Sequence, residues 1–81
     1  MDKQEFNCIL CKRITQLRKE RGFTIENLAY QSGISKGGLS EIERCKKVPM
    51  VFTILKLCAG LGITIKDFFD FQDINDVMKN L

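Results

Sequence analysis

The segment FTIENLAYQSGISKGGLSEIER, residues 23–44, decides the fold of this 81-residue chain. Thr24 is suited to cap a short helix, because its hydroxyl can accept a hydrogen bond from an otherwise unpaired backbone amide. Gly33 ends that helix, and Ser35 is placed to cap a second helix after a three-residue turn. The segment therefore predicts a helix–turn–helix motif, in which the first helix supports the second.

On both sides of this motif, apolar residues recur at spacings of three and four, as in helices that bury one face. Strand signals are nearly absent. We predict an all-α chain with helices over residues 3–21, 25–32, 36–44 and 50–61, a short helix after Thr64, and a final amphipathic segment at 73–80. The side chains expected to point inward after residue 49 include Val51, Ile65, Phe68 and Phe69.

The composition limits the classes of protein to which the chain can belong. Hydrophobic residues make up 44% of the sequence, enough for one core, and no apolar run is long enough to cross a membrane. The start MDKQEFNCIL lacks the features of a secretion signal, so we expect a cytoplasmic protein. Histidine is absent, and so are a nucleophile–base spacing and a phosphate loop, so we expect no enzymatic activity and no cofactor.

Positive charge is concentrated in the first part of the chain. Residues 1–66 carry 12 Lys and Arg against 6 Asp and Glu, whereas residues 67–81 carry one Lys against four Asp. A basic body favours contact with a polyanion such as double-stranded DNA, although a soluble surface with a chance asymmetry would give the same distribution.

Several pieces of the sequence, in order and at matching spacing, resemble one protein family. They are ITQLRKERGFT at 14–24, LA at 28–29, SGIS at 32–35, LSEIER at 39–44 and LCAGLGI at 57–63. Together they are similar to the phage Cro/cI-type repressor domains, also called the xenobiotic-response-element helix–turn–helix family, over about residues 10–70. The chain length and the Phe68-Phe69 pair also resemble the small controller proteins of restriction–modification systems.

The resemblance implies a compact five-helix bundle that serves as a DNA-binding domain over residues 1–70, to which the chain adds a C-terminal tail at 71–81. It also implies a homodimer that binds a two-fold symmetric operator in double-stranded DNA, with half-sites about 34–36 Å apart or a multiple of that. The implied function is that of a sequence-specific transcription regulator, either a repressor or an autoregulator.

By this resemblance, the residues that contact base edges lie on the outer side of the second helix of the motif. They are Lys36, Gly37, Gly38, Ser40 and Glu41. Lys36 can donate to guanine or bind a phosphate, and Glu41 can accept from cytosine or remain solvated. The two glycines replace longer polar side chains, so they either let the backbone lie close to DNA or simply weaken the helix.

Phosphate contacts are expected from both ends of the motif. The candidates are Thr24, Asn27, Arg44, Lys46 and Lys47. The first two lie at the start of the first helix, where free amides and the helix dipole favour an anion. Ile25 stands where the family usually has a phosphate-binding Gln, which leaves Asn27 to reach the phosphate instead.

Three framework features also follow from the resemblance. Arg18 and Glu43 match a partly buried ion pair between the first helix and the recognition helix, so Arg18 is assigned to structure and not to DNA. Cys45 replaces a common Gly, so a left-handed residue after the recognition helix would be strained. Met50 replaces the usual Ser or Thr cap of the next helix.

Four cysteines invite a metal or a redox interpretation. Cys8 and Cys11 lie one helical turn apart, but a structural zinc site needs a second close pair or histidines, so we predict no metal site. The basic neighbours Lys46 and Lys47 leave a thiol sensor at Cys45 as an alternative. The simplest interpretation is that the cysteines are small, partly buried thiols.

The tail carries an apolar stripe with acidic residues between its members. Phe71, Ile74, Met78 and Leu81 recur at spacings of three, four and three. We predict that this stripe, together with Phe52, forms part of a dimer interface, the alternative being that the tail folds back over its own core. A second functional hypothesis is an antitoxin-type module that binds a partner protein through the same tail.

Overall fold

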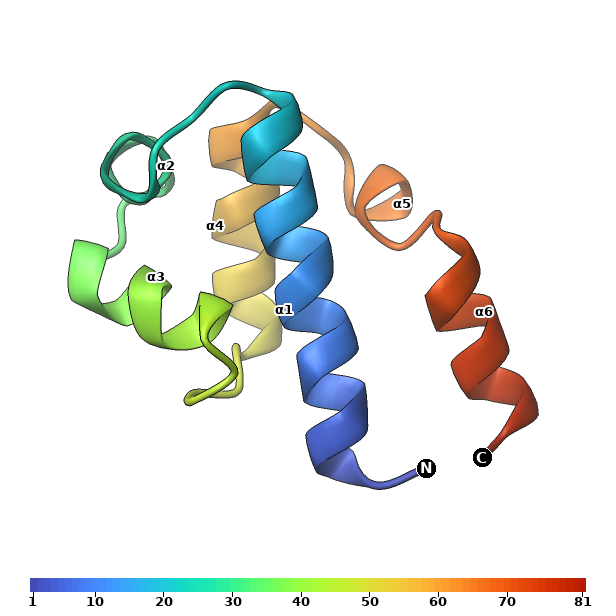
Figure 1. The fold of residues 1–81 in the computed structure, drawn as a ribbon. Helices are drawn as coiled ribbons and strands as arrows, with labels where there is room; N and C mark the ends of the chain where they lie inside the picture. The colour runs from blue at the N-terminus through green and yellow to red at the C-terminus, as the bar shows by residue number, and fades with distance from the viewer.

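The computed structural model describes all 81 residues and contains six helices and no strand (Figure 1). The helices are α1 (Lys3–Glu20), α2 (Ile25–Ser32), α3 (Lys36–Glu43), α4 (Val51–Leu61), α5 (Ile65–Phe68) and α6 (Gln72–Lys79). The prediction of an all-α fold with a helix–turn–helix and an extra C-terminal helix is confirmed. Every helix boundary that the sequence analysis predicted lies within one residue of the observed boundary.

Side-chain caps and left-handed residues explain where the helices begin and end. Thr24, Ser35 and Thr64 each accept a hydrogen bond at 3.0 Å from the backbone amide three residues further on. Gly33 ends α2 with φ 69°, a backbone conformation that favours glycine. Met50 makes no side-chain hydrogen bond at the start of α4, as the sequence predicted.

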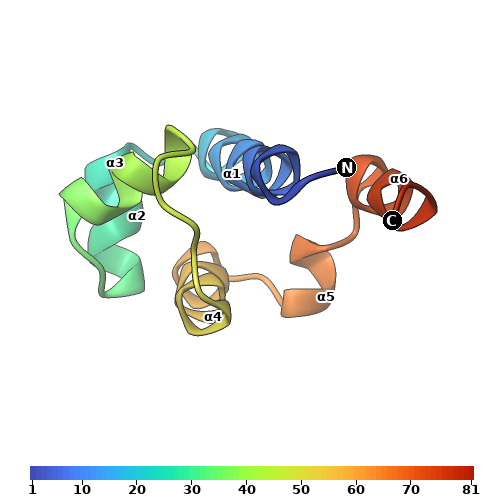
Figure 2. The same ribbon diagram turned by 90° about the horizontal axis from the view of Figure 1, so that it is seen from below.

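The helices are arranged around a central pair, α1 and α4, which lie side by side (Figures 1 and 2). α2 and α3 lie on one side of this pair, and α5 and α6 lie on the other. α6 packs against the first half of α1, so the tail folds back onto its own chain. This arrangement leaves the helix–turn–helix at one end of a body that measures 35 × 24 × 21 Å.

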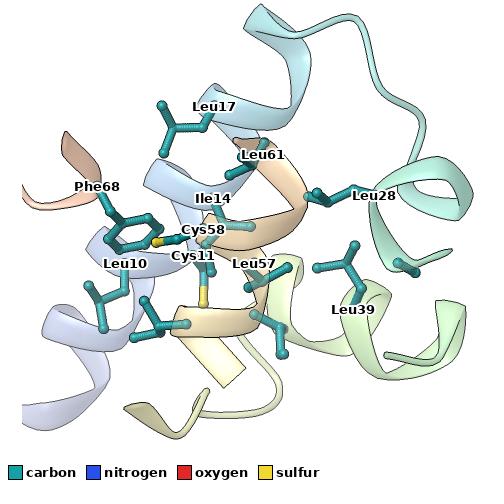
Figure 3. Packing of buried hydrophobic residues seen from close by; sticks show 13 residues of the cluster. Leu10, Cys11, Ile14, Leu17, Leu28, Leu39, Leu57, Cys58, Leu61 and Phe68 are labelled. Carbon is teal, nitrogen blue, oxygen red and sulfur yellow. The ribbon is translucent and has the colours of Figure 1, made fainter. Parts of the chain in front are cut away.

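One hydrophobic core holds the first five helices together. It contains 13 buried side chains, of which those labelled in Figure 3 are Leu10, Cys11, Ile14, Leu17, Leu28, Leu39, Leu57, Cys58, Leu61 and Phe68. α3 contributes to this core through Leu39 and Ile42, which are 0% and 3% exposed. Burial of this apolar surface is the main term that stabilises the fold, and it fixes α3 on the body by its inner face.

Three residues predicted to point inward lie at the surface instead. Val51 is 72% exposed, because it begins α4 and its side chain leans toward the helix N-terminus, beyond the packed body. Ile65 and Phe69 are 39% and 36% exposed. α5 is a single turn, and only Phe68 reaches the core from it, with its ring edge-on to that of Phe69 at 5.0 Å.

Candidate nucleic-acid interface

The first two turns of α3 present the predicted base-contacting residues on its outer side. Lys36, Gly37 and Glu41 are exposed, whereas Gly38 and Ser40 are half-buried. The inner face of the same helix is fixed in the core, so the helix cannot rotate to hide these positions. Nothing in the fold covers this side of α3, which lies at the edge of the molecule in both ribbon views (Figures 1 and 2).

The two glycines of α3 have different surroundings. A Cβ placed on Gly37 would meet nothing within 4 Å. A Cβ placed on Gly38 would lie 2.9 Å from the Oγ of Ser35, which caps the helix. Gly38 is therefore restricted by the cap, whereas no contact within the chain accounts for Gly37.

Lys36 has a partner that the sequence analysis did not identify. Its Nζ lies 3.6 Å from Oε2 of Glu26, in the first turn of α2, and both side chains are largely exposed. Exposed ion pairs of this kind contribute about 0–1 kcal/mol, so Lys36 can exchange this carboxylate for another anion. The sequence offered one signal for this ion pair: Glu26 is an acidic residue in the first turn of α2, the helix that precedes Lys36 across the turn.

The start of α2 combines a helix N-terminus with two capping side chains. Thr24 and Asn27 form a capping box: the Thr24 hydroxyl accepts from the Asn27 amide at 3.0 Å, and Asn27 Oδ1 accepts from the Thr24 amide at 3.4 Å. Both residues are exposed. The Asn27 side-chain NH₂ group and the Thr24 hydroxyl proton remain free to donate outward.

Three basic side chains follow one another at the end of α3. Arg44, Lys46 and Lys47 are all exposed, and Arg44 Nε donates to the Ser40 carbonyl at 3.4 Å. Cys45 between them has φ 61°, the left-handed conformation in which an L-residue is strained, as the sequence analysis expected. Three exposed basic residues therefore lie within four positions of the chain at the end of α3.

A buried ion pair holds α3 against α1. Arg18 Nε donates to Glu43 Oε2 at 2.7 Å and Arg18 Nη2 donates to Oε1 at 3.0 Å, with the two side chains only 12% and 6% exposed. The Thr15 hydroxyl donates to Glu43 Oε1 at 2.9 Å, and Arg18 Nη1 donates to the Phe23 carbonyl at 2.8 Å. The carboxylate therefore has three donors, and the network joins α1, α3 and the residue before α2. Thr15 and Phe23 were absent from the sequence prediction of this site.

Sequence comparison identifies the family. The sequence profile described as the Cro/C1-type HTH DNA-binding domain matches residues 13–73. The chain belongs to the Cro/C1-type helix–turn–helix family. The matched residues include α2 and α3, which form the helix–turn–helix, together with α4 and α5.

Named relatives of this Cro/C1-type chain are transcriptional regulators. SutR of Escherichia coli is 37% identical over 59 residues, which are 73% of this chain and 33% of SutR. DdrOP3 of Deinococcus deserti is 36% identical over 61 residues, 75% of this chain and 47% of the relative. SinR of Bacillus subtilis is 35% identical over 60 residues, 73% of this chain and 54% of SinR. The matched segment thus spans from a third to about half of these relatives, all of which are named as regulators and none as an enzyme.

Solved structures share the fold over most of its length. A point mutant of the restriction-modification controller protein C.Esp1396I matches with a TM-score of 0.80 at 27% identity, over 93% of this chain and 94% of that one. An HTH_3 family transcriptional regulator from Vibrio cholerae matches with a TM-score of 0.79 at 31% identity, over 84% of this chain and 38% of that one. The Cro/C1-type fold therefore extends beyond the segment that the family profile covers.

The predicted dimer residues lie in two separate regions of the Cro/C1-type chain. Phe52 is 64% exposed on α4, with Lys56 Nζ 4.8 Å from the centre of its ring. In the tail, Phe71 and Ile74 are half-buried, whereas Met78 and Leu81 are exposed. The structure thus does not bring Phe52 together with the tail stripe within one chain.

Arg13 is a further residue that the sequence analysis missed. Its Nε and Nη2 donate to the carbonyls of Phe68 and Asp67, both at 2.8 Å, and its guanidinium lies 4.8 Å from the centre of the Phe71 ring. Arg13 therefore attaches α5 and the beginning of the tail to α1, although its charge alone indicated a DNA contact as readily as a structural one.

No cluster of three or more Cys, Asp or Glu side chains is arranged to hold a metal ion. None of the six helices is both long and apolar enough to cross a lipid bilayer.

Proposed function

We propose that the chain is a sequence-specific transcription regulator of the cytoplasm that represses its target, its own gene included, by binding DNA through α3. The observation that carries this proposal is the combination of one exposed face and one fixed face on the same helix. Leu39, Ile42 and Glu43 hold α3 from behind, while its outer side and the basic α3–α4 loop remain free. A helix held in this way can enter the major groove with its first turns toward the base edges.

Direct contacts to bases are expected to be few. Lys36 and Glu41 are the long polar side chains at the outer start of α3, and Ser40 is short and half-buried. Because Gly37 presents no side chain, the backbone can lie close to the bases, and part of the specificity then comes from DNA shape. We therefore expect a short recognised sequence in each half-site, centred on the guanine and cytosine contacts of these two residues.

Phosphate contacts are expected to supply most of the affinity. Thr24 and Asn27 border the N-terminus of α2, and Arg44, Lys46 and Lys47 border the end of α3, so the two groups flank the proposed base contacts. With about four to six phosphates neutralised per dimer, the logarithm of the binding constant should fall with the logarithm of salt concentration at a slope of roughly −4 to −5.

The proposed operator has two-fold symmetry because the chain is proposed to act as a homodimer. α4 and α5 expose four large apolar side chains, Val51, Phe52, Leu55 and Ile65, which are between 39% and 72% exposed. We assign the centre of the dimer interface to Phe52 and these neighbours, and its edge to the tail residues Met78 and Leu81. Two copies of α3 would then face successive major grooves, about 34–36 Å apart.

Selection of bound duplexes from a random library, followed by gel-shift competition, tests the proposal. We expect one recurring two-fold symmetric sequence that outcompetes random DNA. Replacing Arg44, Lys46 and Lys47 with Gln should weaken binding to all sequences and reduce the salt slope, whereas Lys66→Gln on α5, on the opposite side of the body, should change neither. Failure of every selected duplex to bind better than random DNA would exclude sequence-specific regulation.

Sedimentation at several concentrations tests the dimer separately. The wild type should sediment as a dimer, Phe52→Asp should shift it to monomer, and Met78→Asp should weaken it less. A wild type that stays monomeric at its highest soluble concentration and on DNA would rule out the two-fold arrangement.

An antitoxin-type role, in which the tail binds a partner protein, is the second candidate. The observation that favours it is an apolar hollow of about 390 Å³ between the beginning of α1 and α6, lined in part by Phe6, Ile74, Met78 and Leu81. Co-purification from the source cell separates the two functions. A stoichiometric partner that Met78→Asp releases would support the antitoxin role, and a homodimer without a partner would exclude it.

A further inference from the structure

The apolar hollow of about 390 Å³ is bordered by two segments from opposite ends of the chain. α6 runs beside the first half of α1, so the two chain ends lie near each other (Figures 1 and 2). Six of the eight residues that line the hollow are hydrophobic. They are Met1 and Phe6 from the beginning of the chain, and Ile74, Val77, Met78 and Leu81 from the tail.

α6 is attached to the body by apolar contacts. Val77 is its one buried residue, and Ile74 packs partly against the core. The side-chain hydrogen bonds of the tail stay within it: Gln72 donates to the Asp76 carboxylate and Asn80 donates to the Asp76 carbonyl, both at 3.0 Å. An apolar ligand in the hollow would therefore add contacts between α1 and α6 that the chain alone does not make.

Lys3 supplies a free positive charge beside the hollow. It is one of the lining residues, it is exposed, and it forms no ion pair within the chain. Asp2, the other charged lining residue, is already engaged as the cap of α1, where its carboxylate accepts from the Glu5 amide at 2.8 Å. An anionic group on a ligand would thus find Lys3 available, whereas a cationic group would compete with the helix N-terminus for Asp2.

We propose that the hollow binds a small amphiphile with one carboxylate and an apolar part of roughly eight to ten carbons, such as a medium-chain fatty acid. Its volume lies at the lower end of the range for small-molecule sites, about 300–1,000 Å³. The apolar part displaces water from walls that offer it few hydrogen bonds, and the carboxylate stays at the rim beside Lys3. A protein interface buries about 800 Å² on each partner, which this hollow alone cannot supply.

Calorimetric titration with sodium octanoate, below the concentration at which it forms micelles, tests the site. We expect saturable binding of one octanoate per chain and no binding of acetate, which lacks the apolar part. Saturating octanoate should raise the temperature of thermal unfolding, because it binds the folded chain. In NMR spectra, the amide shifts that change should lie at the beginning of α1 and in α6.

Two pairs of variants separate the charge from the apolar walls. Lys3→Gln should weaken octanoate binding about twofold to fivefold, as for the loss of an exposed ion pair, and should leave the uncharged 1-octanol unaffected. Lys12→Gln, on the same helix but outside the hollow, should change neither. Met78→Asp places a charge in the apolar wall and should weaken both ligands about tenfold. Met50→Asp is its control, because Met50 is equally exposed, at 73% against 72%, and lies outside the hollow.

Several results would overturn the site. They are the absence of saturable octanoate binding, many weak sites spread over the surface, and amide shifts that map to α4 instead of α6. Octanoate that binds only after a second copy or a co-purified protein has been removed would assign the hollow to that protein instead. Equal weakening by Lys3→Gln and Lys12→Gln would overturn the role of Lys3. None of these measurements uses DNA, so their outcome is independent of the proposed DNA-binding function.

Discussion

α2 and α3 are both eight residues long, but different interactions stabilise them. α2 has a capping box at its start and a left-handed glycine at its end, so its own sequence supports both of its ends, and it also packs closely against α4. α3 contains two glycines, is followed after its C-cap Arg44 by a strained Cys45, and depends on Leu39, Ile42 and the Glu43 ion pair for its position. The supporting helix is thus capped locally at both ends, whereas the proposed recognition helix depends on contacts to the rest of the chain beyond its Ser35 cap.

The largest effect on stability is expected from removing the ion pair that holds α3. Arg18→Met or Glu43→Gln leaves a nearly buried partner without its counter-charge, which should lower the free energy of unfolding by about 3–5 kcal/mol. Urea denaturation measures the loss. Arg21→Met, at an exposed residue one turn beyond Arg18, is the control and should cost little. A loss below about 1 kcal/mol for both pair variants would show that α3 does not depend on this network.

The second test targets the contact between α2 and α4. A Cβ on Gly60 would overlap Ser32 Oγ and lie 3.1 Å from the Ser32 amide nitrogen, so Gly60→Ala should destabilise the protein by about 1–3 kcal/mol. Thermal unfolding measures the effect. Adding Ser32→Ala removes the overlapping hydroxyl, which has no hydrogen-bond partner, and should restore part of the stability. A Gly60→Ala variant that unfolds at the same temperature as the wild type would mean that α2 and α4 can move apart without loss of stability.

The third test compares the two glycines of α3. Gly37→Ala meets open space and should stabilise the protein by about 0.8–1 kcal/mol, whereas Gly38→Ala crowds the Ser35 cap and should gain less or nothing. Gel shifts on the same variants then distinguish the two interpretations of Gly37. Weaker DNA binding by a more stable Gly37→Ala would support a close approach of backbone to DNA, and unchanged or tighter binding would contradict it.

The smallest effect is expected at Cys45. Cys45→Gly relieves the left-handed strain but loses some packing against the core, so we expect a gain of about 0.5 kcal/mol in the free energy of unfolding. Cys45→Ala keeps the Cβ and serves as the matched control, for which we expect no gain in the free energy of unfolding. Equal stability of the two variants would show that this backbone conformation carries no measurable strain.

The sequence predicted the helices well because their ends depend on neighbouring residues. Thr24, Ser35 and Thr64 could be recognised as caps from local spacing alone, and the structure has all three in that role. The proximity of Arg18 and Glu43 was available only through the family resemblance, because 25 residues separate them.

Contacts between distant segments were beyond sequence reasoning. The sequence shows an acidic residue in the first turn of α2, but only the crossing of α2 and α3 places Glu26 beside Lys36. No local pattern shows that Arg13 reaches the carbonyls of Asp67 and Phe68, more than 50 residues further along the chain. The exposure of Val51 and Ile65 was missed for a related reason: periodicity identifies an apolar face, but not whether another helix covers it.

α1 carries two arginines whose attachments give the molecule a mechanical link. Arg13 donates to the carbonyls of Asp67 and Phe68 just before the tail, and Arg18 donates to Glu43 at the end of α3. Five residues of α-helix place the two arginines about 140° apart around the helix axis. A displacement of the C-terminal segment can therefore reach α3 through α1, the helix that carries both arginines, as well as through α4, which contacts both α5 and α2. α1 is thus one rigid element common to the tail and to the proposed recognition helix, so the positions of these two segments are coupled.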